Sequence, residues 1–243
     1  MTQLRPTALT ISYDWDRTRF ELMDARSHVL AMFEDLGLLR SFRSPQDALS
    51  VRLVDGRSFE VSMDRVEVFE LQCDAPAVPD DHSTPKLAAE VGALLGVQGV
   101  VPRMAFQHMV PWAPGEADEA FRQGARAMVP DADELGAVDF ALLLDGVKGN
   151  WHYQAEAGVI RAEDAPLRLA RQVGRSNAFT PDTWVLRRLD EVSFPEVSTF
   201  VDSSWHLPGK LPVLFEEAED LALRVETLAT EVVEILHHRI HPL

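Results

Sequence analysis

Apolar residues recur every three or four positions along the last thirty residues of the chain. The recurring residues are Leu214, Ala218, Leu221, Val225, Leu228, Val232 and Ile235. This spacing places them on one stripe and predicts a long amphipathic helix over residues 212–238, with Pro212 suited to its first turn. Ala222, Ala229 and Leu236 widen the stripe. We therefore expect the helix to pack on the sheet of its own chain, with its exposed edge or C-terminal end left for a partner.

The first half of the chain changes between strand and helix patterns. Residues 7–15 alternate polar and apolar side chains, which predicts a half-buried strand. The further predicted elements are a helix at 20–39, strands at 49–54, 57–63 and 65–71, a helix at 86–95 and a strand at 103–110. Asp55 and Gly56 tolerate the positive φ of a tight turn and therefore predict a hairpin.

A rigid Pro-Trp-Ala-Pro-Gly segment at residues 111–115 marks a candidate boundary between an N-terminal half, 1–110, and a C-terminal half, 111–243. One continuous domain is the alternative. The second half predicts a helix at 116–128 and strands at 138–144, 150–157, 159–161 continuing toward Arg171, 183–189 and 196–202. The fold class expected is α+β, with antiparallel sheets in two loosely similar halves, helices packed on one face and a long C-terminal helix.

Three short segments together resemble a known family. They are the hairpin around Asp55-Gly56, the short helix followed by residues 103–108, and residues 199–202 ahead of the long terminal helix. In this element order the chain resembles a sporadically distributed bacterial family of uncharacterised α+β proteins. The resemblance implies an α+β fold and transfers no activity and no site residues.

Charge and composition narrow the setting in which the protein works. The 243 residues carry a net charge of −16, which disfavours nucleic acid and anionic membranes as partners. Residues 1–16 show no signal-peptide pattern, and no apolar run approaches the length that spans a bilayer. Cys73 is the only cysteine, so an internal disulfide is excluded and we expect a cytoplasmic protein. The excess of arginine over lysine suggests a GC-rich bacterium.

Sequence motifs for catalysis and cofactor binding are missing. There is no Gly-x-Ser-x-Gly and no phosphate-binding Gly-rich loop. His237 and His241 are one helical turn apart, a spacing that can hold a metal, but no second cluster supports it and we interpret these residues as a solvated helix end. We therefore expect no catalytic residue, no cofactor and no metal.

Residues 161–188 form an arginine window with a net charge of +3 in an acidic chain. Guanidinium groups bind phosphate or carboxylate in two-pronged geometry. The anion-binding candidates are Arg168, Arg171, Arg175, Arg187 and Arg188. The alternative is that these arginines pair with surplus acidic residues, such as those on the outer face of the last helix.

A second candidate is a groove. Trp151 and Tyr153 share one face of a predicted strand, which leaves His152 and Glu156 on the other face as a base and a carboxylate. With His108 these are the groove candidates; a solvated sheet face is the alternative reading.

The function expected is that of a non-catalytic cytoplasmic protein-interaction module, oligomeric and binding a protein partner, with a homodimer as one form. The interface candidates are Leu221, Val225, Leu228, Val232 and Ile235. Two alternatives stay open. One is an enzyme or sensor for a small anionic, phosphorylated ligand held by the arginine window, and the other is a protein that binds nucleic-acid ends.

Overall fold

The structure is a computed structural model of the whole chain. It describes residues 6–15, 21–44, 48–71, 82–97, 99–113, 115, 117–129, 131–135, 140–173, 189, 192–208 and 212–240. Within these ranges no helix is both long enough and apolar enough to cross a membrane.

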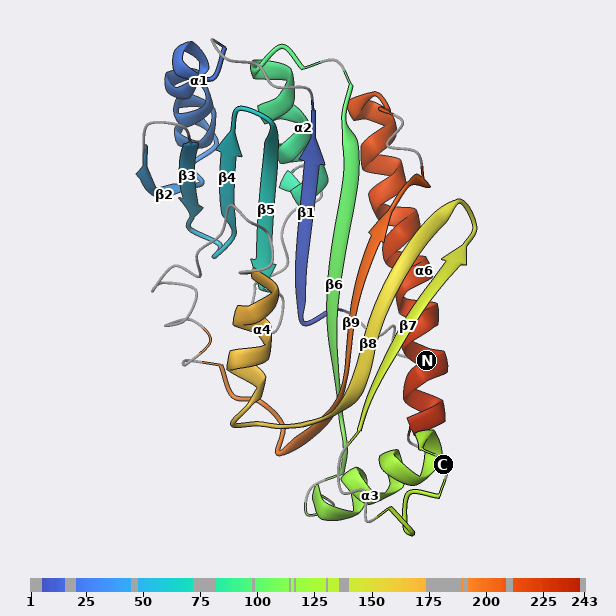
Figure 1. Cartoon of the computed structure of the whole chain (residues 1–243). Helices are drawn as coiled ribbons and strands as arrows, with labels where there is room; N and C mark the ends of the chain where they lie inside the picture. The colour runs from blue at the N-terminus through green and yellow to red at the C-terminus, as the bar shows by residue number, and fades with distance from the viewer. Residues whose placement is uncertain are drawn as a thin grey trace.

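A single antiparallel sheet of nine strands dominates the described residues, in the order β2-β3-β4-β5-β1-β6-β9-β8-β7 (Figure 1). The strands are β1 (Ala8–Asp14), β2 (Leu39–Arg43), β3 (Ala48–Leu53), β4 (Ser58–Ser62), β5 (Arg65–Leu71), β6 (Val101–Pro111), β7 (Ala141–Lys148), β8 (Trp151–Arg161) and β9 (Val197–His206). The expected α+β class is confirmed. Strands from both predicted halves belong to the same sheet, because β6 pairs with β9. The division at residue 110 stays a prediction.

Four helices cover one face of this sheet, which we call the helix face. They are α1 (Glu21–Asp35), α2 (Thr84–Leu94), α3 (Ala117–Met128) and α6 (Phe215–Ile240). The fifth described helix, α4 (Ala165–Val173), lies on the opposite face, which we call the open face (Figure 1). Its Leu169 is fully buried in a small cluster with Ala8, Phe69 and Leu71.

Alternation of side chains in the strands produces the two faces. In β1, Leu9, Ile11 and Tyr13 are buried in the main core under the helices. Thr10 and Ser12, between them, point to the open face. The predicted two-sided strand is therefore confirmed, and the tight turn at Gly56 takes the expected positive φ of 96°.

A buried arginine fastens the β3–β4 hairpin to the start of α2. Arg57 is 1% exposed and donates to Asp55 at 2.6 Å and to the backbone oxygen of His82 at 2.6 Å. It also donates to Thr84, which in turn donates to the carboxylate of Glu70. The charged groups are thus held inside the fold by mutual hydrogen bonds.

Helix α6 packs on the central strands β6, β9 and β8, as the widened stripe predicts. Small side chains let it approach the sheet closely, and the buried positions are Ala218, Ala222, Val225, Ala229, Val232, Val233, Leu236 and Ile240. The buried face is therefore shifted relative to the predicted stripe: it adds Val233 and Ile240 and leaves out Ile235. Leu214 precedes the helix and is 55% exposed, and Ile235 is 64% exposed. Pro212 lies ahead of the first turn, because the adjacent Val213 forms a β-bridge with Val100.

Three elements differ from the sequence predictions. The strands expected separately at 150–157 and 159–161 form one continuous strand, β8. The expected continuation of a strand from residue 161 toward Arg171 is wrong, because α4 begins at Ala165 after a turn. The edge strand β2 was not predicted at all; it is short and largely exposed, so it carries little alternation. The predicted strand at 183–189 falls outside the described residues except for Leu189.

Candidate functional site

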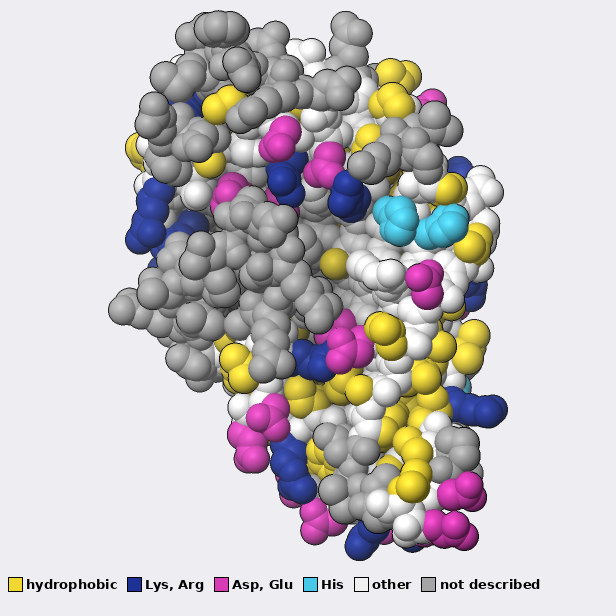
Figure 2. All heavy atoms as spheres, in the orientation of Figure 1, with side chains coloured by type: hydrophobic (Ala, Val, Ile, Leu, Met, Phe, Trp, Pro, Cys, Tyr) yellow, Lys and Arg dark blue, Asp and Glu magenta, His cyan; other side chains and the backbone are white. Residues whose placement is uncertain are grey.

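A row of polar side chains crosses the open face from one edge of the sheet to the other. The pairing register places its members directly opposite one another on successive strands. In spatial order they are Arg43, Ser50, Glu60, Glu67, Ser12, Arg103, His206 and His152, and the row ends at the apolar Val147 on β7. Figure 2 views this face and shows its charged and histidine side chains.

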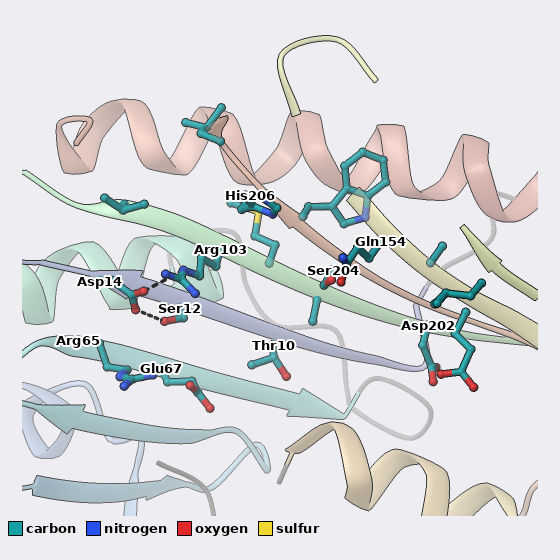
Figure 3. A pocket seen from close by; sticks show the side chains of 18 residues that line it. Thr10, Ser12, Asp14, Arg65, Glu67, Arg103, Gln154, Asp202, Ser204 and His206 are labelled. Atoms are coloured by element: carbon teal, nitrogen blue, oxygen red, sulfur yellow. Dashed lines mark hydrogen bonds and ion pairs between the residues drawn. The ribbon is translucent and has the colours of Figure 1, made fainter. Parts of the chain in front are cut away.

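A cavity of about 640 Å³ lies over the middle of this face, floored by β5, β1, β6, β9 and β8. Figure 3 shows the side chains that line it. Arg103 pairs with Asp14, with 2.9 Å between Nε and Oδ2, and the Ser12 hydroxyl donates to the same carboxylate at 2.7 Å. Arg65 lies directly across from Asp14 on the neighbouring strand. The cavity floor therefore presents both signs of charge.

Two carboxylates face each other within the row. Glu60 and Glu67 are directly opposite on β4 and β5, and Glu67 is 2% exposed. Burial, and then the charge of Glu67, raise the pKa of Glu60 to about 7. Glu60 is therefore only partly ionised near neutral pH.

Two histidines face each other at the border of the cavity, which His206 helps to line. The rings of His152 and His206 lie 5.7 Å apart between centroids, on β8 and β9. Burial, and then the neighbouring His152 and Arg103, lower the pKa of His206. Across the described ranges, no three or more His, Cys, Asp or Glu side chains are grouped so that they could hold a metal ion.

Arg168, a predicted anion-binding residue, lies between two carboxylates at the end of the cavity nearest α4. It contacts Asp202 at 2.7 Å and Glu156 at 3.0 Å. Its guanidinium carbon also lies 3.5 Å above the centre of the Phe200 ring. The arginine therefore pairs with acidic residues of the chain, although on the sheet rather than on the outer face of α6.

The other predicted residues are distributed over both faces. His152 and Glu156 lie on the open face, as the alternation around Trp151 and Tyr153 predicts. His108 lies on the helix face, 1% exposed, so the structure does not bring it together with the other two. The side chain of Arg171 and the whole of Arg175, Arg187 and Arg188 lie outside the described residues.

The two edges of the sheet differ in how they are protected. Strand β2 has five residues, a register irregularity between Leu39 and Ser41, and the cations Arg40 and Arg43. Short length, bulges and positive charge are the usual devices that stop an edge strand from pairing with another chain.

Strand β7 is longer and has no register irregularity, and its one cation, Lys148, pairs with Glu231 of α6. It has eight residues, pairs with β8 in unbroken register, and no other described strand pairs with its outer side. Leu143 and Val147 are 76% and 62% exposed on the open face. Hydrophobic side chains gather over this part of the molecule in Figure 2.

Helix α6 extends the apolar surface beside β7 on the helix face. Lys148, at the end of β7, pairs with Glu231 at 2.7 Å, and Leu228 lies 3.9 Å from the position that a Cβ on Gly149 would take. Ile235 follows Glu231 by one helical turn on the same side of α6 and is exposed. Of the five predicted interface residues, Val225 and Val232 are core, Leu221 and Leu228 are half-buried, and Ile235 is exposed.

Comparison with protein-family models and with curated proteins gave no match to this chain. The resemblance to the sporadically distributed bacterial family stays a prediction.

Sequence reasoning missed Arg103, Glu60, Glu67 and His206 as members of one surface. The alternation in each strand indicates which residues share a face, but the strand order decides which residues meet. The apolar Ala-Leu-Leu-Leu run at the start of β7 was the available signal for the unprotected edge.

Proposed function

We propose that this protein is a non-catalytic, cytoplasmic protein-interaction module that takes a β-strand of a protein partner on the outer edge of β7. The observation that carries the proposal is the contrast between the two sheet edges. One is short, irregular and basic, whereas the other is long, regular and apolar. Strand addition to an exposed edge is a common mode of peptide recognition, because backbone hydrogen bonds give affinity and alternate side chains give specificity.

The apolar surface around β7 supports the same proposal. Leu142 and Leu144 are half-buried on the helix face beside α6, and Leu143 and Val147 project from the open face. An added strand would therefore find apolar contacts on both faces of the sheet. Burying such contacts contributes about 25 cal/mol for each Å² of apolar surface removed from water.

A peptide selection tests the proposal. A displayed library of random ten-residue peptides is panned on the protein, and we expect recovered peptides that alternate apolar and polar residues. Leu143→Asp with Val147→Asp places two charges on the edge and should abolish their binding. Val54→Asp with Leu167→Asp is the matched control, because these side chains are 56% exposed and lie on the β3–β4 turn and on α4. Equal recovery on both double variants would rule the proposal out.

The open-face cavity favours a second candidate function, the binding of a small ligand that carries both a positive and a negative group. Arg65 and Arg103 face it together with Asp14 and Glu67. In this candidate the anionic group of the ligand would bind Arg65 and Arg103 and not Arg168, which already pairs with Asp202 and Glu156.

Thermal shift against zwitterionic and phosphorylated metabolites tests this candidate. A ligand that raises the melting temperature should lose its effect in Arg103→Gln. It should keep that effect in Arg122→Gln, because Arg122 is similarly exposed but lies on α3. Absence of any shift across the panel would end this candidate.

A further inference from the structure

We infer that the strand received by β7 is the β7 strand of a second copy of this chain, paired antiparallel about a two-fold axis at Leu144. This inference rests on the proposed function and names its partner. The two sheets would then join into one continuous sheet, with the α6 helices of both copies on the same side.

The register follows from the side chains of β7. Residues that lie directly opposite each other in an antiparallel pair project to the same face of the sheet. In β7 the even-numbered residues face the helices and the odd-numbered residues face the open side. The helix faces of the two copies therefore lie on the same side only when even-numbered residues oppose even-numbered ones. Two such registers join seven residues of each copy. One centres on Asp145 and sets two carboxylates directly opposite each other, which is unfavourable. The other centres on Leu144.

In the Leu144-centred register no two charged residues lie opposite each other. Leu144 opposes Leu144 of the second copy on the helix face, and Leu142 opposes Gly146. The Tyr153 ring covers Gly146, since a Cβ there would lie 2.8 Å from the ring. Leu142 of the second copy would therefore pack on an aromatic surface. On the open face, Leu143 opposes Asp145 and Ala141 opposes Val147.

Charge favours this surface over others of the same chain. Each copy carries a net charge of −16, so two copies repel wherever acidic surfaces meet. Along β7 the only charged residues are Asp145 and Lys148, and Lys148 pairs with Glu231. The exposed Ile235 of α6 continues the apolar surface on the helix face. A weakly charged, self-complementary strand is thus available in a chain that otherwise repels itself.

Light scattering during gel filtration tests the inference. We expect twice the chain mass of 27.1 kDa for the wild type, with a dissociation constant that falls as salt screens the repulsion. Leu143→Asp should raise the dissociation constant at least tenfold. The new carboxylate of each copy would face Asp145 of the other, which creates two repulsive pairs. Leu143→Lys should preserve the dimer, because the same geometry then forms two cross-strand ion pairs. Val54→Asp and Val54→Lys, at a valine 56% exposed on the β3–β4 turn, should change nothing.

Cross-linking reads the register directly. With Cys73 replaced by serine, Leu144→Cys should link two copies through a short thiol reagent, whereas Asp145→Cys should not. Efficient linkage at Asp145→Cys, or loss of the dimer in both Leu143 variants, would overturn the proposed register.

The outcomes separate this inference from the proposed function. A chain that stays monomeric at all concentrations but still selects edge-binding peptides overturns the second-copy inference and leaves the proposed function standing. A monomeric chain that selects no such peptides overturns both.

Discussion

The guanidinium of Arg168 donates from Nε to the Oδ2 atom of Asp202 across 2.7 Å, and Asp202 is only 4% exposed. The contact joins α4 to β9 on the open face. It holds the helix against the sheet, and it neutralises a carboxylate that is withdrawn from water.

Removing the arginine should leave that carboxylate buried without its cation. Arg168→Met should lower the free energy of unfolding by about 3 kcal/mol, measured by urea denaturation at pH 7. Asp202→Asn in the same chain should recover part of the loss, because the amide carries no charge. A loss below 0.5 kcal/mol would show that water reaches Asp202.

Glu60 should make stability depend on pH. Its pKa is raised to about 7 in the folded state, so the folded protein binds more protons than the unfolded chain between pH 4.5 and 7. Stability therefore falls as the pH rises through that window. Glu60→Gln should stabilise the protein at pH 8 and change little at pH 4.5. Glu163→Gln, at an exposed turn, is the control. If Glu60→Gln changed the stability equally at pH 8 and at pH 4.5, the raised pKa of Glu60 would be contradicted.

His108 should act in the opposite direction. Burial lowers its pKa to about 4, and neither ring nitrogen has a hydrogen-bond partner among the described residues. The folded protein therefore binds fewer protons than the unfolded chain between pH 4 and 6.5, so stability falls as the pH drops through that window. The slope should approach 1.4 kcal/mol for each pH unit. His108→Leu should flatten it, and an unchanged slope would exclude His108 as its source.

Gly158 leaves the space that the Phe200 ring occupies. A Cβ there would lie 2.7 Å from the ring and 2.9 Å from the backbone oxygen of Phe140, which cannot rotate away. Gly158→Ala should cost about 2–3 kcal/mol. Gly149→Ala should cost only about 1 kcal/mol, because that turn has a φ of 61° but ample room. Thermal denaturation of both variants measures this difference. Equal losses of unfolding free energy in the two variants would contradict it.

Two residues of the predicted α6 stripe should respond differently to substitution. Val225→Ala should cost about 2 kcal/mol in unfolding free energy, because the side chain is fully buried, and should leave self-association unchanged. Ile235→Asp should leave the unfolding of the monomer within about 0.5 kcal/mol and weaken self-association. Sedimentation measures self-association and urea denaturation measures stability. If Val225→Ala weakened self-association and Ile235→Asp destabilised the monomer, the assignment of the buried and exposed sides of α6 would be wrong.

Much of the fold was predictable, because local patterns determine it. Strand β5 matches its predicted range, and β1 has the predicted buried and polar faces. Helix α4 carried a recognisable start signal in Asp164-Ala165-Pro166, since a capping residue followed by proline in the first turn is typical of a helix N-terminus. The strand prediction failed there because it relied on the arginine-rich composition around Arg168 and did not use the helical spacing of the apolar residues.

The candidate site was less predictable, because it depends on long-range pairing. The face that carries His152 and Glu156 followed from alternation alone. Arg103 meets His206 only through the order β6-β9-β8, and no local pattern encodes that order. The α6 stripe was shifted for a related reason: Val233 and Ile240 are buried although the predicted stripe did not include them, because the position of the sheet decides which side of the helix is covered.

The pairing of β6 with β9 has a consequence for how the protein is made. Pro111 pairs with Ser198 and Arg103 with His206, so about ninety to a hundred residues are synthesised between the two strands. At 5–20 residues per second, that interval lasts roughly 5–20 s. The eleven residues of β6 meanwhile present an open edge on the ribosome. The nascent chain therefore passes through a period in which an unpaired strand edge is exposed, and such edges are prone to aggregation.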